Sequence, residues 1–363
     1  MTSKKKGILE RLSEGIVLGD GGYLLELEKR GRVRAGPFTP EVALNNPDAL
    51  LELHREFRDA GAEILQALTF YASRDKLATV GMEERVEELN RAAVRIAKQA
   101  AGDQCLVAGN LSLTWMYEPN NKSAADRVRK TFDEQLDVQV AEGVDFIIGE
   151  TFSFLGEALL AVERAKATKL PVMLTICFEN EDITTDGSTA ANAARALMDA
   201  GADIVGINCL RSPEHTLPLM AEMRQAVKGY IGCQPAAYRT THTHRDFTSL
   251  SAFPDQLEPY QLTRREMGEY AAKARDLGVN YIGACCGAVA THIREMARVL
   301  GKLPADDRVW KKGGEKPMSA YEYYSHGEKA IANRHGIPHR ILLLTNGYFW
   351  HIVAPGYYCV LSP

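Results

Sequence analysis

Three cysteines, two of them adjacent, are the residues of this sequence best suited to carry chemistry. Cys285 and Cys286 lie in YIGACCGAVATHIREM, where small neighbours leave both thiols unhindered, and Cys209 lies near the end of the apolar run DIVGINCL. Adjacent side chains of an extended strand point to opposite sides, so the backbone must bend before both thiols can face one metal ion. Three thiolates with one open position are typical of a catalytic zinc site. Spacing alone leaves a second interpretation open, because buried free cysteines are also common core residues.

The other four cysteines show no such pattern. Cys105, Cys177 and Cys233 fit packing residues of a core, and Cys359 lies in a C-terminal segment of irregular pattern. Seven cysteines, an odd number, in a chain of 363 residues do not resemble the disulfide framework of a small secreted protein. The lysines near the N-terminus are not followed by the apolar run of a secretory signal. We therefore expect a reducing, cytoplasmic location.

Two carboxylates and four aromatic residues also occur close to the ends of apolar runs. Asp20 in GDGG and Glu150 in GET could bind a substrate ammonium group, or could be buried carboxylates satisfied by backbone N–H groups. The aromatic residues could form a cage that attracts a quaternary ammonium or sulfonium group, although ordinary packing is the simpler explanation. These aromatic residues are Tyr23, Phe38, Phe70 and Tyr71.

Eight short apolar runs would position these residues. Each run is rich in β-branched residues and almost continuously apolar, as buried parallel strands are. The runs are residues 16–22, 62–70, 105–112, 145–152, 171–178, 203–210, 230–236 and 281–287. Patterns of helical period lie between them, at residues 50–61, 86–102, 124–143, 190–201 and 264–278.

This alternation predicts an α/β fold, a parallel (β/α)8 barrel of the TIM type. The alternative is a doubly wound open sheet, but no GxGxxG motif follows the first run. The active site of such a barrel lies at the carboxyl ends of the strands. Asp20 ends the first run, Phe70 and Tyr71 the second, Glu150 the fourth, Cys209 the sixth and the cysteine pair the eighth. We therefore expect these side chains to converge on one mouth of the barrel.

The overall composition argues against nucleic-acid and membrane partners. A net charge of −4 gives no basic excess for nucleic acid or for an anionic membrane. Residues 341–360 are apolar and aromatic, but polar residues, glycine and proline interrupt them, so we expect no spanning helix.

We expect two parts in the chain. Residues 1–310 would form the barrel domain, and residues 311–363 a C-terminal extension whose role the sequence leaves open. Within the extension, KKGGEKP (311–317) has the composition of a linker, and residues 318–336 could be a helix.

Several segments together resemble the homocysteine S-methyltransferase family and, within it, the betaine–homocysteine S-methyltransferase branch. GINC (206–209) combined with YIGACCG (281–287) is specific to the family, and FYASRDKL (70–77) with KKGILERL (5–12) is typical of the betaine branch. Further matching stretches are GDGGYLLELEKRG (19–31), AGPFTPE (35–41), LHREFRDAGAEILQALTFYASRDKL (53–77) and CQPAAY (233–238). The resemblance covers most of the chain.

The resemblance implies a (β/α)8 barrel that binds Zn²⁺ through Cys209, Cys285 and Cys286. It implies a homocysteine site formed by Asp20, Gly21, Gly22 and Glu150, and a donor site formed by Tyr23, Phe38, Phe70 and Tyr71. The implied reaction transfers a methyl group from a cationic donor, foremost glycine betaine, to homocysteine and yields methionine. The donor leaves as a neutral molecule, so no catalytic residue beyond the zinc site is expected. The implied partners are these small molecules, with a homo-oligomer as one open expectation.

The sequence departs from the betaine branch around the donor site. Phe38 stands where those enzymes carry Trp, Thr151 where they carry Tyr, and Ala67 where they carry Thr; their long C-terminal arm is not recognisable. Loss of the indole N–H could favour a dimethylsulfonium donor, such as dimethylsulfoniopropionate or S-methylmethionine.

Two other functions fit parts of the pattern. A zinc hydrolase on the same barrel would use histidine and carboxylate ligands, whereas His242 and His244 of THTH lie away from the predicted strand ends. A non-catalytic protein that binds a quaternary amine would keep the aromatic cage but would need no thiol acceptor. An assay for methyl transfer separates both from the main interpretation.

Overall fold

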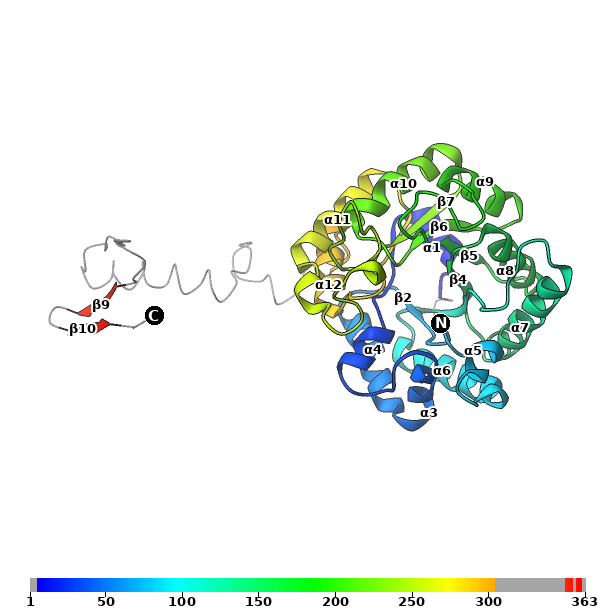
Figure 1. The fold of residues 1–363 in the computed structure, drawn as a ribbon, viewed down its shortest axis with the longest axis horizontal. Helices are drawn as coiled ribbons and strands as arrows, with labels where there is room; N and C mark the ends of the chain where they lie inside the picture. The colour runs from blue at the N-terminus through cyan, green and yellow to red at the C-terminus, as the bar shows by residue number, and fades with distance from the viewer. Residues whose placement is uncertain (1–4, 304–349, 355–356, 361–363) are drawn as a thin grey trace. The chain divides into compact units, whose positions relative to one another are not determined.

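The computed structural model describes residues 5–303, 350–354 and 357–360 (Figure 1). The chain divides into two compact units, residues 1–303 and 304–363. In the second unit, β9 (Trp350–Ala354) and β10 (Tyr357–Val360) form an antiparallel pair. The linker predicted at residues 311–317 and the helix considered at 318–336 lie outside the described residues.

The first unit is a ring of eight parallel strands surrounded by helices, which confirms the predicted (β/α)8 barrel (Figure 1). The strands are β1 (Val17–Leu18), β2 (Ile64–Gln66), β3 (Leu106–Ser112), β4 (Phe146–Phe152), β5 (Val172–Ile176), β6 (Ile204–Asn208), β7 (Tyr230–Gln234) and β8 (Tyr281–Ile282). From β2 to β8 each strand pairs with the next, and β1 pairs with β8. The N–H of Glu63, just before β2, donates to the carbonyl of Leu18 at 2.9 Å and closes the ring. All eight predicted runs contain a strand.

One major helix follows each strand, and five of these eight helices were predicted. They are α4 (Pro47–Asp59), α6 (Val86–Ala101), α7 (Lys122–Ala141), α8 (Leu155–Ala167), α9 (Ala190–Asp199), α10 (Pro213–Ala226), α11 (Arg264–Asp276) and α12 (Ala290–Val299). The helices that the sequence did not predict are α8, α10 and α12. In α10, Pro218 lies inside the helix and obscures the helical pattern.

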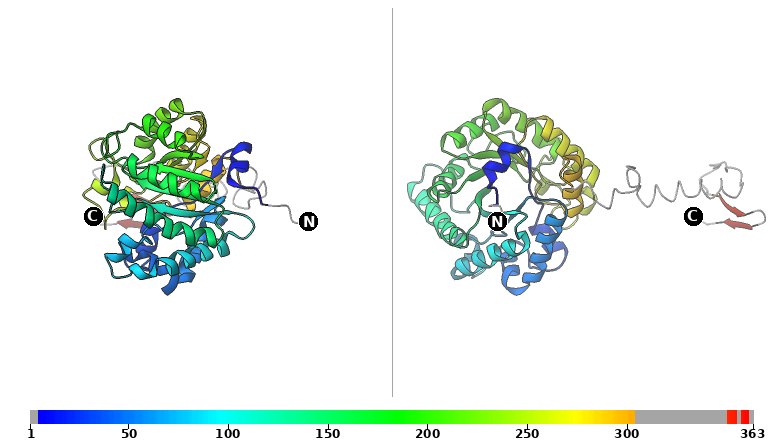
Figure 2. Two further views of the ribbon diagram at one scale, coloured as in Figure 1. Left: turned by 90° about the vertical axis from the view of Figure 1, so that its right-hand side faces the viewer. Right: turned by 180° about the vertical axis from the view of Figure 1, so that it is seen from behind.

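Short helices lie in the loops and before the first strand. They are α1 (Ile8–Glu14), α2 (Leu24–Lys29), α3 (Val42–Asn45) and α5 (Arg74–Ala78), with 3-10 turns η1 (Gly36–Glu41), η2 (Glu83–Arg85), η3 (Phe247–Ser249) and η4 (Glu258–Tyr260). Helix α1 lies across the ring when the barrel is seen from behind (Figure 2). Its Ile8 and Leu12 pack on buried side chains inside the ring, among them Phe146 and Tyr281. The amino end of the barrel is therefore sealed, and the carboxyl end carries the long loops.

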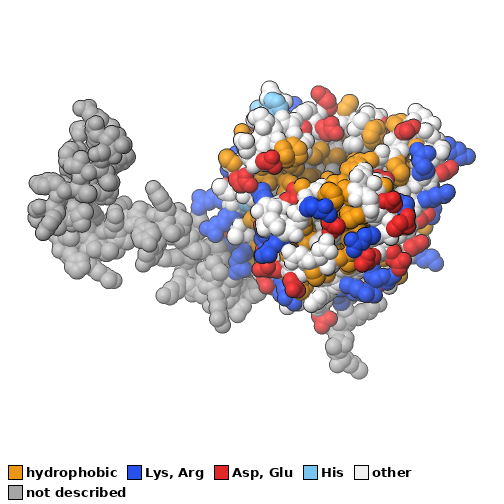
Figure 3. All heavy atoms as spheres, turned by 60° about the horizontal axis from the view of Figure 1, so that its bottom comes forward, with side chains coloured by type: hydrophobic (Ala, Val, Ile, Leu, Met, Phe, Trp, Pro, Cys, Tyr) orange, Lys and Arg blue, Asp and Glu red, His pale blue; other side chains and the backbone are white. Residues whose placement is uncertain are grey.

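The surface of the barrel carries mixed charge. In the face shown in Figure 3, basic and acidic side chains are interspersed, and apolar side chains gather around a hollow. None of the helices in the described part of the chain combines the length and apolar character that a membrane span requires.

Candidate active site

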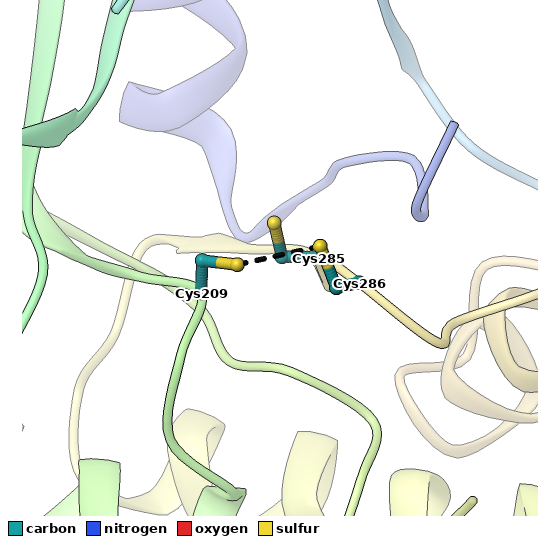
Figure 4. Close-up of side chains that lie close together, drawn as sticks. All are labelled: Cys209, Cys285 and Cys286. Atoms are coloured by element: carbon teal, nitrogen blue, oxygen red, sulfur yellow. Dashed lines mark hydrogen bonds between the residues drawn. The ribbon is translucent and has the colours of Figure 1, made fainter. Parts of the chain in front are cut away.

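The three cysteines singled out in the sequence lie together at the carboxyl ends of β6 and β8 (Figure 4). Their Sγ atoms all lie within 4.8 Å of one another, and those of Cys209 and Cys286 are 3.5 Å apart. All three are free thiols. Three sulfur atoms bound to one tetrahedral zinc ion would lie roughly 3.8 Å apart, so the spacing of this donor set is compatible with such an ion.

The backbone bends at both strand ends to bring the thiols together. Cys209 and Leu210 adopt left-handed conformations, with φ of 57° and 52°, which residues other than glycine rarely adopt outside functional sites. The N–H of Cys285 donates to the carbonyl of Pro235 at 2.9 Å, and that of Ala237 donates to the carbonyl of Cys286 at 2.8 Å. The loop after β7 thus fixes the bend that two adjacent thiols need before they can face one ion.

A buried arginine supports the segment that follows Cys209. The backbone N–H of Arg211 donates to the Cys209 carbonyl at 2.7 Å. Its guanidinium donates to the carbonyls of Phe178, Glu179 and Glu181 and pairs with Asp182 at 2.5 Å. Arg211 therefore ties the loop after β5 to the strained turn that carries the first thiol.

Two glycines of the first βα loop make close contacts beneath the site. A Cβ atom at Gly22 would lie 2.7 Å from the carbonyl oxygen of Cys285 and 3.1 Å from the Cα of Cys286. A Cβ atom at Gly21 would lie 2.6 Å from the ring of Phe57. Backbone atoms cannot move aside as a flexible side chain can, so only glycine fits at position 22.

The Glu150 carboxylate lines the same cavity as the thiols and is held by three amide side chains. Its Oε1 accepts from Gln66 at 2.6 Å and from Asn110 at 2.7 Å, and its Oε2 accepts from Asn208 at 3.2 Å. The amide of Asn208 is itself oriented, because its Oδ1 accepts from the Thr151 N–H at 2.8 Å. Burial raises the pKa of Glu150 to about 8, although the amide donors oppose this shift.

Asp20 also lines this cavity and is hydrogen-bonded on its protein side. It accepts from the Tyr23 hydroxyl at 2.6 Å and from the Gln66 N–H at 2.7 Å, and the Tyr23 oxygen lies 2.8 Å from Nδ1 of His54. Burial raises the pKa of Asp20 to about 6. Within residues 5–303, neither Asp20 nor Glu150 forms a salt bridge with a cationic side chain. Two buried carboxylates without such a partner suit a ligand that brings an ammonium group.

Of the four aromatic residues predicted to bind a donor, Tyr23 and Phe70 line the cavity. Tyr71 lies beside Phe70, with their ring centroids 5.0 Å apart in an edge contact. Phe38 is covered on one face by the guanidinium of Arg34, 3.7 Å from the ring centroid. The structure therefore brings two of the four to the cavity wall and places Tyr71 and Phe38 outside its lining.

A buried lysine lies behind Phe70 and Tyr71. The ammonium of Lys76 lies 4.4 Å from the centroid of Phe70 and donates to the Phe70 carbonyl at 2.9 Å and to the Ser112 hydroxyl at 2.8 Å. Burial lowers the pKa of Lys76 to about 8. One side of this aromatic pair thus already carries a cationic group, which was not expected from the sequence.

The sequence interpretation missed the amides of Gln66, Asn110 and Asn208. A signal was present, because each is a polar residue within or at the end of a predicted apolar strand. It also missed an apolar wall beside the thiols, which the loop after β7 forms with Tyr238 and Phe247 among other residues. Cys285 and Cys286, which are partly buried, pack against this wall. The cysteines interpreted as packing residues, Cys105, Cys177 and Cys233, are buried.

Comparison with known proteins identifies the family of this chain. The family model described as homocysteine S-methyltransferase matches residues 17–300. Betaine–homocysteine S-methyltransferase 1 of Mus musculus is 44% identical over 308 residues, which are 82% of this chain and 75% of that protein. Its counterpart in Danio rerio is 43% identical over 328 residues, covering 86% and 81% of the two chains. S-methylmethionine–homocysteine S-methyltransferase BHMT2 of Pongo abelii is 41% identical over 304 residues, 82% of each chain.

The fold is also similar to that of a solved bacterial protein. The metallated form of the homocysteine methyltransferase MmuM from Escherichia coli matches with a TM-score of 0.63 at 19% identity, over 78% of this chain and 96% of that chain. This likeness supports the fold, and the matches in sequence decide the family. The chain belongs to the homocysteine S-methyltransferase family.

Proposed function

We propose that this protein transfers a methyl group from a cationic donor to homocysteine, with Zn²⁺ held by Cys209, Cys285 and Cys286. The observation that carries the proposal is the juxtaposition of three free thiols with two buried carboxylates in one cavity. The thiols suit a soft metal ion, and the carboxylates suit the ammonium group of an amino acid whose sulfur reaches that ion.

The metal is assigned from the donor set. Three thiolates select Zn²⁺ over the hard ions Mg²⁺ and Ca²⁺, and the position left open accepts a further sulfur ligand. When bound, Zn²⁺ lowers the pKa of a coordinated thiol and keeps it as a nucleophilic thiolate near neutral pH. The same donor set argues against a zinc hydrolase, because three thiolates make zinc a poorer Lewis acid for activating water.

Homocysteine binding rests on Asp20 and Glu150. Both carboxylates are buried and face the cavity, so an α-ammonium group would supply the cationic partner that residues 5–303 do not provide. The amides of Gln66, Asn110 and Asn208 hold Glu150 in one orientation. Gly21 and Gly22 let the first loop approach closely enough to complete this side of the cavity.

The chain's contribution to the transfer is positioning and exclusion of water. Attack of a thiolate on a cationic methyl donor removes charge, and a dry cavity favours that step over bulk water. The apolar wall with Tyr238 and Phe247 provides such surroundings. The leaving group departs neutral, so no general acid is needed, and no histidine of the described chain lines the cavity.

Glycine betaine is the leading donor and a dimethylsulfonium compound the alternative. The relatives include proteins named for betaine and for S-methylmethionine. The guanidinium of Arg34 covers one face of Phe38, and the ammonium of Lys76 lies against Phe70. These two rings are therefore not fully available to surround a cationic donor. We further expect a cytoplasmic location, in which the three thiols stay reduced, and a homo-oligomer as one possible state.

The test is methionine formation by the zinc-loaded full chain from homocysteine and a panel of donors. The panel contains glycine betaine, S-methylmethionine and dimethylsulfoniopropionate, each over a range of concentrations. We expect methionine with at least one donor and the highest kcat/KM with glycine betaine. A higher kcat/KM with either sulfonium would replace the leading donor by the alternative. No methionine with any donor would contradict the proposed function and favour a binding protein.

A further inference from the structure

Two histidines and a glutamate form a second cluster of metal-ligating side chains away from the cysteines. Glu214 and His215 lie in the first turn of α10, and His242 lies in the loop that follows β7. One possible ligand atom from each of the three lies within 4.8 Å of the other two. The THTH segment that contains His242 has no role in the proposed methyl transfer.

The distance between the two imidazoles suits a shared ion better than a direct hydrogen bond. Nε2 of His215 lies 3.4 Å from Nδ1 of His242, beyond the usual range for a hydrogen bond between these groups. Two imidazole nitrogens on one tetrahedral ion, each about 2.0–2.1 Å from the metal, lie roughly 3.4 Å apart. The two rings therefore already have the separation that a bound ion requires.

The far side of His215 is hydrogen-bonded in the way that prepares a metal ligand. Its Nδ1 lies 2.8 Å from the Thr240 hydroxyl, and Thr240 donates its own hydrogen to Ser212 at 3.0 Å. Nδ1 also lies 3.2 Å from the Ser212 hydroxyl. In the tautomer that carries its hydrogen on Nδ1, this atom donates to Thr240 and the Nε2 lone pair faces His242, which is the arrangement in which outer hydrogen bonds orient metal-binding histidines.

The turn that carries His242 is held in place by its own backbone. The Thr241 N–H donates to the His244 carbonyl at 2.9 Å, and the His244 N–H donates to the Thr241 hydroxyl at 3.0 Å. Beyond the turn, the Arg245 N–H donates to Asn180 at 2.9 Å. A tethered turn reduces the entropy that His242 would lose on binding an ion.

The local charges permit a cation. Burial lowers the pKa of His215, which favours the neutral ring that a metal ligand needs. Two guanidinium groups approach this region, those of Arg211 and Arg245, and both pair with Asp182, at 2.5 Å and 2.8 Å. Glu214 contributes a carboxylate to the cluster.

We propose that Glu214, His215 and His242 form a second site, which binds a divalent transition-metal ion such as Zn²⁺ or Cu²⁺. Imidazole and carboxylate ligands suit these ions, whereas the three thiols form a separate, softer site. An ion here would join the start of α10 to the loop after β7. These two segments also support the cysteines, through Arg211 at Cys209 and Ala237 at Cys286. The site is exposed, so its ion exchanges with solvent more readily than the ion of the thiol site.

The test counts bound Zn²⁺ in the full chain after removal of metal by a chelator and equilibrium dialysis against Zn²⁺. We expect two equivalents for the wild type and one for His215→Ala and for His242→Ala. His244→Ala is the matched control, because this residue lies in the same turn outside the cluster, and it should keep two. Cys286→Ser should lose the other equivalent, which separates this site from the thiol site.

Cobalt gives a second readout that does not depend on activity. Co²⁺ at the thiol site produces sulfur-to-metal charge-transfer absorption, whereas Co²⁺ bound by imidazole and carboxylate does not. In His242→Ala we expect the charge-transfer band to remain while total bound Co²⁺ falls by one equivalent. Methionine formation by the His242→Ala variant should be unchanged. A wild type that binds only the ion of the thiol site, or a His242→Ala variant that still binds two ions, would overturn the proposal.

Discussion

The orientation of Glu150 is fixed by residues that reach it from three other strands. Gln66 in β2, Asn110 in β3 and Asn208 in β6 each donate an amide hydrogen to it. These three hydrogen bonds fix the buried carboxylate from the side of the protein, while its other side lines the cavity and can meet a ligand. A bound ammonium group would lower the raised pKa of Glu150 and favour its charged form, so we expect the charge of this group, rather than its shape, to matter for the acceptor.

Glu150→Gln keeps the size of the side chain and removes its charge. We expect the KM for homocysteine to rise by about ten- to a hundredfold, since a hydrogen bond to a charged group contributes about 1.5–3 kcal/mol. The KM for the donor should change little. Steady-state kinetics with each substrate varied in turn measures both values. An equal rise of both KM values, or a fall in kcat alone, would contradict the assignment of Glu150 to homocysteine.

The atoms closest to a Cβ at Gly22 would be backbone atoms of Cys285 and Cys286, not side-chain atoms. Gly22→Ala puts a Cβ atom 2.7 Å from the Cys285 carbonyl oxygen, so the cysteine segment or the first loop must shift. We expect a loss of about 1–3 kcal/mol in the free energy of unfolding and reduced zinc content. Gly15→Ala is the matched control, because a Cβ there meets no atom within 4 Å. Chemical denaturation and metal analysis of both variants check this, and equal behaviour of the two would refute it.

At the scale of elements, the loops after β2, β3 and β4 meet at a buried polar cluster. Glu157 in α8 accepts from the N–H of Thr114 at 2.7 Å and from its hydroxyl at 2.6 Å. Burial raises the pKa of Glu157 to about 7, and Lys76 is buried in α5, between β2 and β3. Lys76 contacts Phe70 and Ser112, the last residue of β3, so we expect the protonation of Glu157 to affect the stability of this side of the mouth.

Glu157→Gln should alter how stability depends on pH. The pKa of Glu157 is higher in the folded state than in the unfolded chain, where it is about 4.5. Its stabilising contribution is therefore complete below about pH 4.5 and is lost as pH rises through about 7. We expect the free energy of unfolding of the wild type to fall relative to the variant by roughly 1–3 kcal/mol over that interval. Urea denaturation at pH 5 and pH 8 measures this, and a constant difference between the two proteins would contradict it.

The elements also show which features can be predicted from sequence and which cannot. Apolar runs separated by helical patterns predicted all eight barrel strands, and the rule that active sites lie at strand ends then placed Cys209 beside the cysteine pair. Helix α10 was not predicted, because Pro218 interrupts its helical pattern. The amides around Glu150 come from three different strands, and their meeting depends on the register between those strands. That register cannot be predicted from any one segment of the sequence. The stacking of Arg34 on Phe38 depends on a loop conformation that has no periodic signal.

At the scale of the whole molecule, the barrel separates stability from function along its axis. Helix α1 and the cluster around Phe146 and Tyr281 seal the amino end. The carboxyl end carries the thiols, the two carboxylates and four non-glycine residues with positive φ, namely Asn120, Thr151, Cys209 and Leu210. Strain and buried charge are thus concentrated where a bound ion and an ammonium ligand would offset them.

The most direct test of the thiol site is zinc content measured together with methionine formation in the wild type and in Cys286→Ala. Cys105→Ala is the control, because Cys105 is a buried cysteine outside the cluster. All three proteins should first be dialysed against a low Zn²⁺ concentration that fills the thiol site alone. We predict that the wild type and Cys105→Ala retain one zinc ion and form methionine, whereas Cys286→Ala loses both the ion and the activity. A Cys286→Ala variant with full zinc content and full activity would contradict the assignment of the three cysteines.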